Sequence, residues 1–403
     1  MKIIAADYIY TPKGFLTGHG VAFAETIKEI APVKTLQQKY PDAQLIETHK
    51  DSVLYPGFIN THVHLEFSSN RTTLTYGSFI PWLNSVIEDR NELVKKCEPQ
   101  TMLNACNELL RSGVTSFGAI SSFGLELEAC IKAPQRVVFF NELIGSNPQT
   151  IDVIYADFKE RIKASSMHAE NRIIPAIAIH APYSVHPIAL RHAITLAKEN
   201  EYVLCAHLLE SQAERSWLDT SDGEFQAFFE TNFNQSAPLT TAKEFIEAFD
   251  GYPTHFTHCV QATKEELEHL YRQGHTIAHC PRSNRYLGCG RLAIENLKVP
   301  FSVATDGLSS NNTLSILDEL RAALMLHHQG PLQQLASKLI RSVTSDAADI
   351  LKLECGQIVP NKLADFTVIT LPDTPKNLEE IPLWTILHTK EASQVYIQGE
   401  QYV

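Results

Sequence analysis

The sequence predicts an α/β protein: a (β/α)8 TIM-like barrel with a small β-sandwich module built from both chain termini. In the middle of the chain, short apolar strand patterns alternate with amphipathic helix patterns, and eight such strands can be counted. The two ends carry strand patterns with little helical periodicity. Alternating strands and helices are typical of a parallel sheet with helical crossovers, and eight strands favour a closed barrel over an open sheet.

The barrel strands are expected at eight apolar runs: Val53–Asn60, Val114–Ile120, Arg136–Leu143, Ile173–His180, Val203–His207, His255–Cys259, Thr276–Cys280 and Phe301–Asp306. Helical patterns lie between them, including Thr101–Arg111, Pro187–Glu199, Lys264–Gln273 and Leu314–His327. In such a barrel the carboxyl ends of all strands meet at one face, where active sites are found.

The chain ends resemble each other in pattern. Strand patterns occur at residues 3–10, 20–23 and 27–30, and again at 364–371 and 394–398. Neither end has enough strands to bury a core alone, so we expect them to form one module together. The predicted domains are the N-terminal part of the β-sandwich module at 1–52, the barrel at 53–350 and the C-terminal part of the module at 351–403.

Composition limits the functional class. The 403 residues suit a barrel of roughly 250 residues with an accessory module. The net charge of −12 argues against a nucleic-acid or anionic-membrane surface. The eight cysteines form no C-x-x-C pair, which is typical of buried, reduced thiols. The N-terminus lacks the pattern of a secretory signal, and no apolar run approaches the roughly 20 residues of a membrane span. We therefore expect a cytoplasmic protein that acts on a small molecule.

Potential metal ligands stand at the ends of four predicted strands. His62 and His64 end the first strand two residues apart, so their side chains point the same way and can bind one divalent metal. His207 ends the fifth strand, His258 the sixth and Asp306 the eighth. Position and residue type agree across four separate segments, which predicts a functional site.

The segments around these residues resemble the ordered signatures of the amidohydrolase superfamily, in its cytosine deaminase and chlorohydrolase branch. Four motifs match in order, Pro56–His64, His207–Glu210, His258–Val260 and Thr305–Asn312, and the Gly356–Phe366 segment of the terminal module also fits. The resemblance covers nearly the whole chain, and four motifs in the right order make it specific.

The resemblance implies one metal held by four side chains: His62, His64, His207 and Asp306. It also implies that His258 orients the attacking water. A metal lowers the pKa of its bound water toward about 7, and Asp306 can then accept the water's proton. Glu210 can protonate a ring nitrogen and deliver a proton to the departing amine. Together these roles predict a hydrolytic deaminase.

Two absences define the reaction class further. Binuclear members of the superfamily carry a carboxylated lysine at the end of strand four, yet residues 173–185 contain no lysine. One divalent transition metal per chain is therefore expected, and three imidazoles with a carboxylate suit Zn²⁺ and Fe²⁺ alike. The unrelated zinc deaminases carry a P-C-x-x-C motif, whereas Cys280-Pro281 has the reverse order and no second cysteine at that spacing.

The helix after the first strand resembles that of nucleoside-deaminating members, whose glutamate at this place binds ribose hydroxyls. Glu88 matches that glutamate, and the further matches for substrate contacts are Trp82, His180 and Ser310. These residues imply a nucleoside substrate attacked at C6 of its purine.

Four further runs, 70–83, 180–185, 207–211 and 283–285, resemble the bacterial aminofutalosine deaminases. Those enzymes convert 6-amino-6-deoxyfutalosine to futalosine in menaquinone biosynthesis. Because that substrate carries a benzoate, Arg282 or Arg285 is expected to bind its carboxylate.

Several alternatives stay open from the sequence. The substrate could instead be adenosine, 5′-methylthioadenosine, S-adenosylhomocysteine, a free base or a chlorinated triazine; the last two offer Glu88 nothing to bind. A non-catalytic barrel scaffold is disfavoured, because every ligand and Glu210 are present. The sequence leaves open the choice between zinc and iron and whether the chain forms a homo-oligomer.

Overall fold

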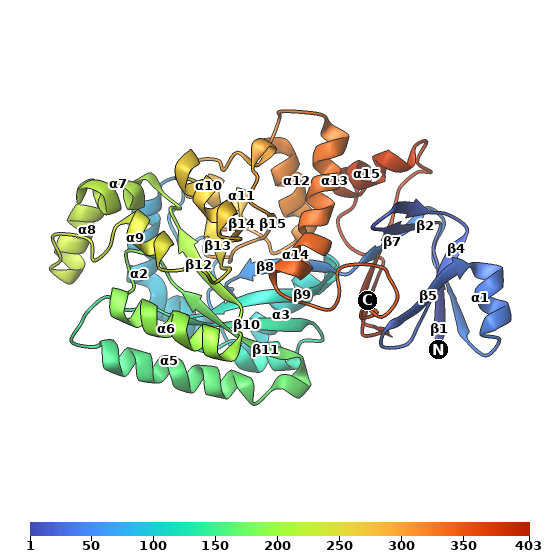
Figure 1. The fold of residues 1–403 in the computed structure, drawn as a ribbon, viewed down its shortest axis with the longest axis horizontal. Helices are drawn as coiled ribbons and strands as arrows, with labels where there is room; N and C mark the ends of the chain where they lie inside the picture. The colour runs from blue at the N-terminus through green and yellow to red at the C-terminus, as the bar shows by residue number, and fades with distance from the viewer.

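The computed structural model describes all 403 residues. Eight parallel strands form one sheet in chain order and are surrounded by helices (Figure 1). They are β8 (Phe58–Val63), β9 (Val114–Ser121), β10 (Arg136–Leu143), β11 (Ile173–Ile179), β12 (Leu204–Leu208), β13 (His255–His258), β14 (Thr276–His279) and β15 (Phe301–Val303). The predicted (β/α)8 fold is confirmed.

Polar contacts join the first and last strands of the barrel. The backbone N–H of Asp306 donates to the carbonyl of His62 at 3.1 Å. The side chain of Asn60 donates to Thr305 Oγ1 at 2.7 Å and accepts from the Thr305 backbone N–H at 3.2 Å. Below this contact, the hydroxyls of Thr61 and Ser302 lie 2.6 Å apart. We call this junction of β8 and β15 the barrel seam.

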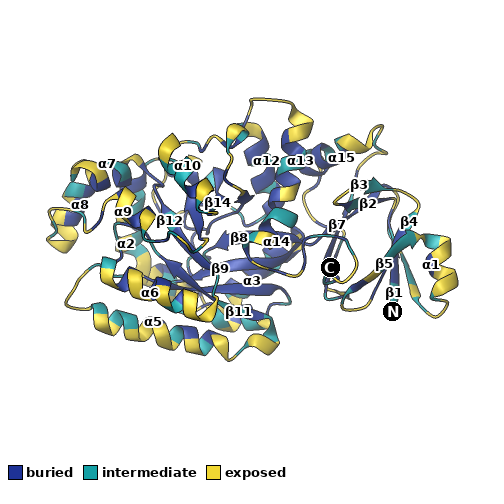
Figure 2. Ribbon diagram, viewed as in Figure 1, coloured by how far each residue is buried: buried dark blue, intermediate teal, exposed yellow.

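The barrel strands are almost entirely buried, whereas the surrounding helices expose their outer faces (Figure 2). The barrel helices are α2 (Phe79–Lys96), α3 (Pro99–Arg111), α4 (Leu127–Lys132), α5 (Ile151–Ser166), α6 (Pro187–Asn200), α7 (Gln212–Thr220), α8 (Glu224–Phe233), α9 (Ala242–Glu247), α10 (Lys264–Arg272), α11 (Pro281–Tyr286), α12 (Ile316–Leu326), α13 (Leu332–Ser342) and α14 (Ser345–Ile350). Three short 3₁₀ turns lie at Ala169–Asn171, Ile294–Asn296 and Leu378–Glu380.

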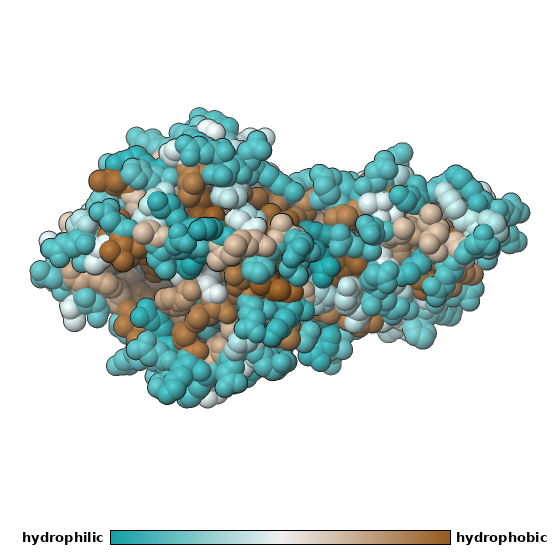
Figure 3. Space-filling model, turned by 90° about the horizontal axis from the view of Figure 1, so that it is seen from below, coloured by the Kyte–Doolittle hydropathy of each residue, from teal (hydrophilic) through white to brown (hydrophobic).

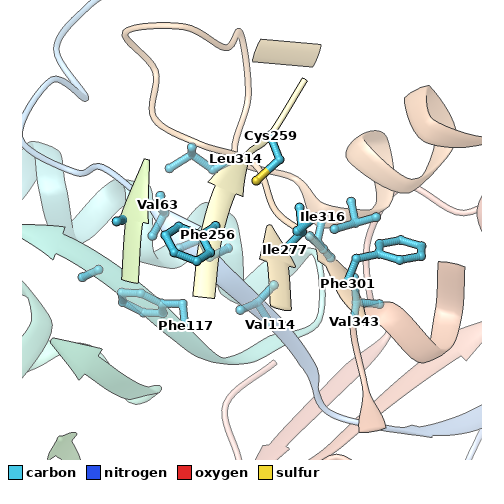
Figure 4. Packing of buried hydrophobic residues seen from close by; sticks show 14 of the residues in the cluster. Val63, Val114, Phe117, Phe256, Cys259, Ile277, Phe301, Leu314, Ile316 and Val343 are labelled. Carbon is cyan, nitrogen blue, oxygen red and sulfur yellow. The ribbon is translucent and has the colours of Figure 1, made fainter. Parts of the chain in front are cut away.

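Apolar side chains fill the space between the strands and their helices. Figure 4 shows Phe117 of β9, Phe256 of β13 and Ile277 of β14 in this core, with Phe301 of β15 close by. All eight cysteines are buried and free, as the sequence predicts. None of the helices combines the length and apolar composition that a membrane crossing requires.

Strands from both chain ends form two further sheets beside the barrel (Figure 1). One sheet has the order β5-β4-β1-β6, from Ile27–Pro32, His19–Phe23, Lys2–Ala5 and Gln44–Glu47, and carries helix α1 (Val33–Lys39). The other has the order β18-β17-β16-β7-β2-β3, from Glu400–Gln401, Gln394–Ile397, Phe366–Thr370, Ser52–Pro56, Tyr8–Thr11 and Gly14–Leu16. Helix α15 (Ile381–His388) lies between β16 and β17 in the chain.

The two sheets share a core to which both chain ends contribute. Phe23 of β4 packs on Phe366 of β16 and on Tyr396 of β17, with ring centroids 5.2 and 6.1 Å apart. A buried ion pair between Arg136 and Asp365, 2.6 Å long, links β10 of the barrel to the residue that precedes β16. The predicted module of both termini is therefore present.

The structure corrects one predicted strand, since Val53–Asn60 is two strands and not one. Its first half belongs to β7 of the module, and its second half begins β8 of the barrel. The chain crosses at Gly57, where a Cβ atom would lie 2.1 Å from Thr115 Oγ1, so only glycine fits. The predicted domain boundary after residue 52 falls within β7.

Candidate active site

The predicted metal ligands converge at the carboxyl ends of the barrel strands. The Nε2 atoms of His64 and His207 lie 3.4 Å apart. Oδ1 of Asp306 lies 3.8 Å from His62 Nε2 and 3.7 Å from His64 Nε2. His62 lies in β8 and His64 directly after it, His207 lies in β12, and Asp306 follows β15, so the site spans the barrel seam.

Hydrogen bonds orient two of these imidazoles. Nδ1 of His207 lies 2.7 Å from the carbonyl oxygen of His180, so this nitrogen carries the proton and Nε2 keeps its lone pair. Nδ1 of His62 lies 3.2 Å from the Thr257 hydroxyl. The Nε2 atom of His62 is buried and has no hydrogen-bond partner. Burial lowers the pKa of all three imidazoles, that of His64 to about 3, which favours the neutral form that binds metals.

The arrangement of these donor atoms fits one metal ion. Two ligand atoms that each lie about 2.1 Å from a metal, at angles between tetrahedral and trigonal, are roughly 3.4 to 3.6 Å apart. The separations between the imidazole nitrogens and the Asp306 oxygen are close to this range. A cation between them would also give the buried His62 Nε2 the partner that it lacks.

Asp306 is held in one orientation by its surroundings. Its Oδ2 accepts hydrogen bonds from the hydroxyls of Ser283, at 2.7 Å, and Ser310, at 2.9 Å. Burial opposes its charge, but the imidazoles of His64 and His258 hold the pKa of Asp306 below its ordinary value. The backbone of Asp306 has a φ of 58°, an uncommon left-handed conformation for a residue other than glycine.

Glu210 and His258 face each other across the site. Nε2 of His258 lies 3.6 Å from Glu210 Oε2, while Nδ1 of His258 lies 2.8 Å from Asn284 Oδ1. The position of Glu210 is set by Glu214, whose carboxylate accepts hydrogen bonds from the backbone N–H groups of Leu209 and Glu210 at 2.9 and 2.7 Å. Burial, and secondly the charge of Asp306, raise the pKa of Glu210 well above its ordinary value.

These groups form the floor of a cavity of about 400 Å³. Apolar side chains form its walls: Phe79, Trp82 and Leu83 from α2, and Phe228, Phe229 and Phe233 from α8. The Trp82 indole is fixed by donating to the carbonyl of Ser309 at 2.8 Å. On the face seen in Figure 3, apolar side chains gather over the barrel half of the molecule. An apolar pocket with a few polar groups at its base is typical of small-molecule sites.

The structure brings together most of the residues that the sequence singled out. The pocket is lined by His64, Trp82, His180, His207, Glu210, His258, Asp306 and Ser310. His62 completes the floor behind them, next to His64 and Asp306.

Three predicted substrate contacts lie elsewhere. Glu88 is exposed and outside the pocket lining, because the side chains of α2 that face the cavity recur at positions 79, 82, 83, 86, 87 and 90. Arg282 is also absent from the lining, and its guanidinium donates to Glu319 at 2.7 Å and to the Thr313 carbonyl at 2.8 Å. Arg285 is exposed on α11 and does not line the pocket.

The sequence reasoning missed two charged residues of the pocket wall. Glu142, near the end of β10, is fully buried and accepts from the Ser122 hydroxyl at 2.6 Å, while its other oxygen has no partner. The strand-end rule that selected His207 also applies to Glu142 and could have found it. Arg90 lies on the pocket face of α2 at the helical spacing that starts from Phe79.

Comparison with known proteins agrees with this geometry. The model of the amidohydrolase family matches residues 53–401. An aminodeoxyfutalosine deaminase of Nitratiruptor sp. is 44% identical over the full length of both chains. An adenosine deaminase of Helicobacter pylori is 36% identical, covering 96% of this chain and 95% of its own. The crystal structure of H. pylori aminofutalosine deaminase in complex with methylthio-coformycin superposes with a TM-score of 0.94 over the full length of both chains, at 34% identity. The chain is a member of the amidohydrolase family.

Proposed function

We propose that this protein is a hydrolytic deaminase of adenosine-type nucleosides that converts 6-amino-6-deoxyfutalosine to futalosine and ammonia. The observation that carries the proposal is the convergence of three histidines, Asp306 and Glu210 on the floor of an apolar pocket. The full-length similarity to aminodeoxyfutalosine and aminofutalosine deaminases supports the choice of substrate. With this substrate, the proposed reaction is a step of menaquinone biosynthesis. We place it in the cytoplasm.

The proposed cofactor is one divalent transition metal per chain, Zn²⁺ or Fe²⁺. His62, His64, His207 and Asp306 would hold it, as their spacing and the unpartnered His62 Nε2 suggest. When bound, the metal would lower the pKa of a coordinated water, so that water can attack a purine ring at neutral pH.

Three side chains would act on the attacking water and on the protons of this reaction: Asp306, His258 and Glu210. Asp306 accepts the proton of the attacking water, and His258 orients that water, with Asn284 fixing the ring of His258. Glu210 carries a proton to the ring nitrogen and then to the departing amine, which leaves as ammonia. Burial raises the pKa of Glu210, in line with this role as an acid.

Glu142 takes the role that the sequence suggested for Glu88. The sugar of a bound nucleoside needs a hydrogen-bond acceptor for its hydroxyls, and Glu142 has a buried, unpartnered carboxylate oxygen on the pocket wall. His180 stands beside it: one side-chain ligand atom from each of Glu142, His180 and His207 fits within 4.8 Å of the others. Glu142 and His180 would therefore bind the sugar and the adjoining edge of the purine.

Adenosine is a second candidate substrate, favoured by the similarity to the H. pylori adenosine deaminase. The two candidates share the purine and the sugar and differ only in the 5′ substituent. Steady-state rates on 6-amino-6-deoxyfutalosine, adenosine and 5′-methylthioadenosine separate them. We expect the highest kcat/KM for 6-amino-6-deoxyfutalosine; a higher value for adenosine would reverse the assignment, and no deamination of any of the three would refute the proposed function.

A further inference from the structure

The pocket wall carries one permanent cation. Three carboxylates line the cavity, Glu142, Glu210 and Asp306, and among Lys and Arg residues only Arg90 does so. An arginine that is the only Lys or Arg side chain on the wall would be selective for an anionic part of a ligand.

The guanidinium of Arg90 is free to bind such a group. It makes no hydrogen bond and no ion pair with any side chain or carbonyl, and lies 5.6 Å from the ring centroid of Phe123. Arg161 nearby is different, because it donates to Asp157, at 2.9 Å, and to the Glu142 carbonyl, at 2.9 Å. Arg90 therefore offers the two parallel N–H groups with which arginine binds a carboxylate.

Large apolar side chains are exposed around Arg90 at the pocket rim. Ile87, Phe123 and Ile144 all line the cavity, yet they are 46%, 42% and 38% exposed. When a ligand covers apolar side chains that are exposed to water at the mouth of a pocket, the burial of their surface stabilises the complex. A ligand that suits this rim has an apolar, flat body that ends in an anion.

We propose that Arg90 binds the carboxylate of an aromatic acid that the substrate carries on its sugar, with the ring of that acid packed on Ile87, Phe123 and Ile144. This inference rests on the proposed function, because deamination fixes the purine at the Glu210 end of the cavity and leaves the 5′ substituent to extend toward the rim. Arg90 is thus the residue that separates this substrate from adenosine, and Arg282 and Arg285 are not.

The test compares Arg90→Met with Arg285→Met, a matched control that removes an arginine outside the pocket. The substrates are 6-amino-6-deoxyfutalosine, its carboxylate methyl ester and 5′-deoxyadenosine. We expect Arg90→Met to lower kcat/KM for the acid by roughly ten- to 150-fold, the usual cost of losing a hydrogen bond to a charged group. The ester and 5′-deoxyadenosine should change less than about threefold, and Arg285→Met should match the wild type. Calorimetric titration of futalosine should show the same loss of affinity for Arg90→Met alone, and Arg90→Lys should restore part of it.

The outcomes separate this inference from the proposed function. Equal losses on all three substrates, or a wild type that does not prefer the acid to its ester, would overturn the role of Arg90 while leaving the deaminase intact. A loss confined to Arg285→Met would transfer the role to Arg285. A wild type that deaminates none of the three would refute the proposed function itself.

Discussion

His62 and His255 are both buried in the barrel, but only His255 has a hydrogen-bond partner for each of its ring nitrogens. His62, at the carboxyl end of the barrel, has a buried Nε2 with no partner. His255, at the opposite end of its strand, has both nitrogens paired: Nδ1 with the Thr276 hydroxyl at 2.8 Å, and Nε2 with the hydroxyls of Thr61 and Ser302 at 3.1 and 3.3 Å. Burial lowers the pKa of both rings, that of His255 to about 3. Burial and a displaced pKa are therefore shared by the proposed metal ligand His62 and by His255, and the missing hydrogen-bond partner distinguishes His62 from His255.

The strongest test of this comparison removes each histidine in turn. His62→Asn should abolish the proposed metal site and lower the deamination rate by at least about 10³-fold, since a metal contributes several kcal/mol to such a reaction. His255→Asn should retain the metal. Elemental analysis of the purified variants checks both, against about one ion per wild-type chain. Two ions per active chain, or metal loss from His255→Asn alone, would contradict the distinction.

The second largest effect on the reaction rate is expected at Glu210, which lies beside the proposed metal ligands. Glu210→Gln preserves size and polarity but cannot transfer a proton, so kcat should fall by about 10² to 10⁴ while metal content stays near that of the wild type. Glu214→Gln is an informative comparison, because the Glu214 carboxylate accepts hydrogen bonds only from the backbone N–H groups of Leu209 and Glu210. Loss of metal from Glu210→Gln would instead make this residue a ligand.

A smaller effect on catalytic efficiency is expected at Glu142, which we propose binds the sugar. Glu142→Gln should reduce kcat/KM by roughly ten- to 150-fold on a nucleoside with both hydroxyls, and much less on its 2′,3′-dideoxy analogue, which cannot make the contact. Glu88→Gln is the control on the exposed side of α2. If Glu88→Gln shows the sugar-dependent loss and Glu142→Gln does not, the original interpretation of Glu88 is restored.

The smallest effect is expected at His255, whose two ring nitrogens are both hydrogen-bonded. His255→Ala leaves the hydroxyls of Thr61 and Ser302 without their imidazole partner, which should lower the free energy of unfolding by about 1 to 3 kcal/mol. Urea denaturation followed by circular dichroism measures this change. Catalytic rates of the folded variant should be close to those of the wild type, and a large drop in rate at unchanged stability would disprove a purely structural role.

The sequence predicts the barrel and the floor of its site well, because both depend on periodic rules. His62, His207, His258 and Asp306 could be identified because strand ends in a parallel barrel all meet at one face. The wall of the pocket follows a different rule. Which face of α2 points inward depends on how the helix packs, and a shift of two positions exchanges Glu88 for Arg90.

Two further sequence predictions were wrong because the structure at those positions depends on residues far away in the chain. Arg282 looks like a free cation in the sequence, but Glu319, on another helix, engages its guanidinium. The run from Val53 to Asn60 looks continuous because both of its halves are apolar. That it changes sheets at Gly57 depends on the contact with Thr115, a residue of the next barrel strand.

The barrel seam has a consequence for how the protein is made. His62 and His64 leave the ribosome early, whereas Asp306 emerges only when most of the chain has been synthesised. The backbone bond from Asp306 to His62, and the contact of Gly307 with His64, form only once the first and last strands meet. Because this contact joins residues that are far apart in the sequence, it requires the closure of a long stretch of chain, which favours its formation late in folding. A growing chain therefore presents the imidazoles of His62, His64 and His207 before it presents Asp306, so the proposed four-ligand site would be complete only once the barrel has closed.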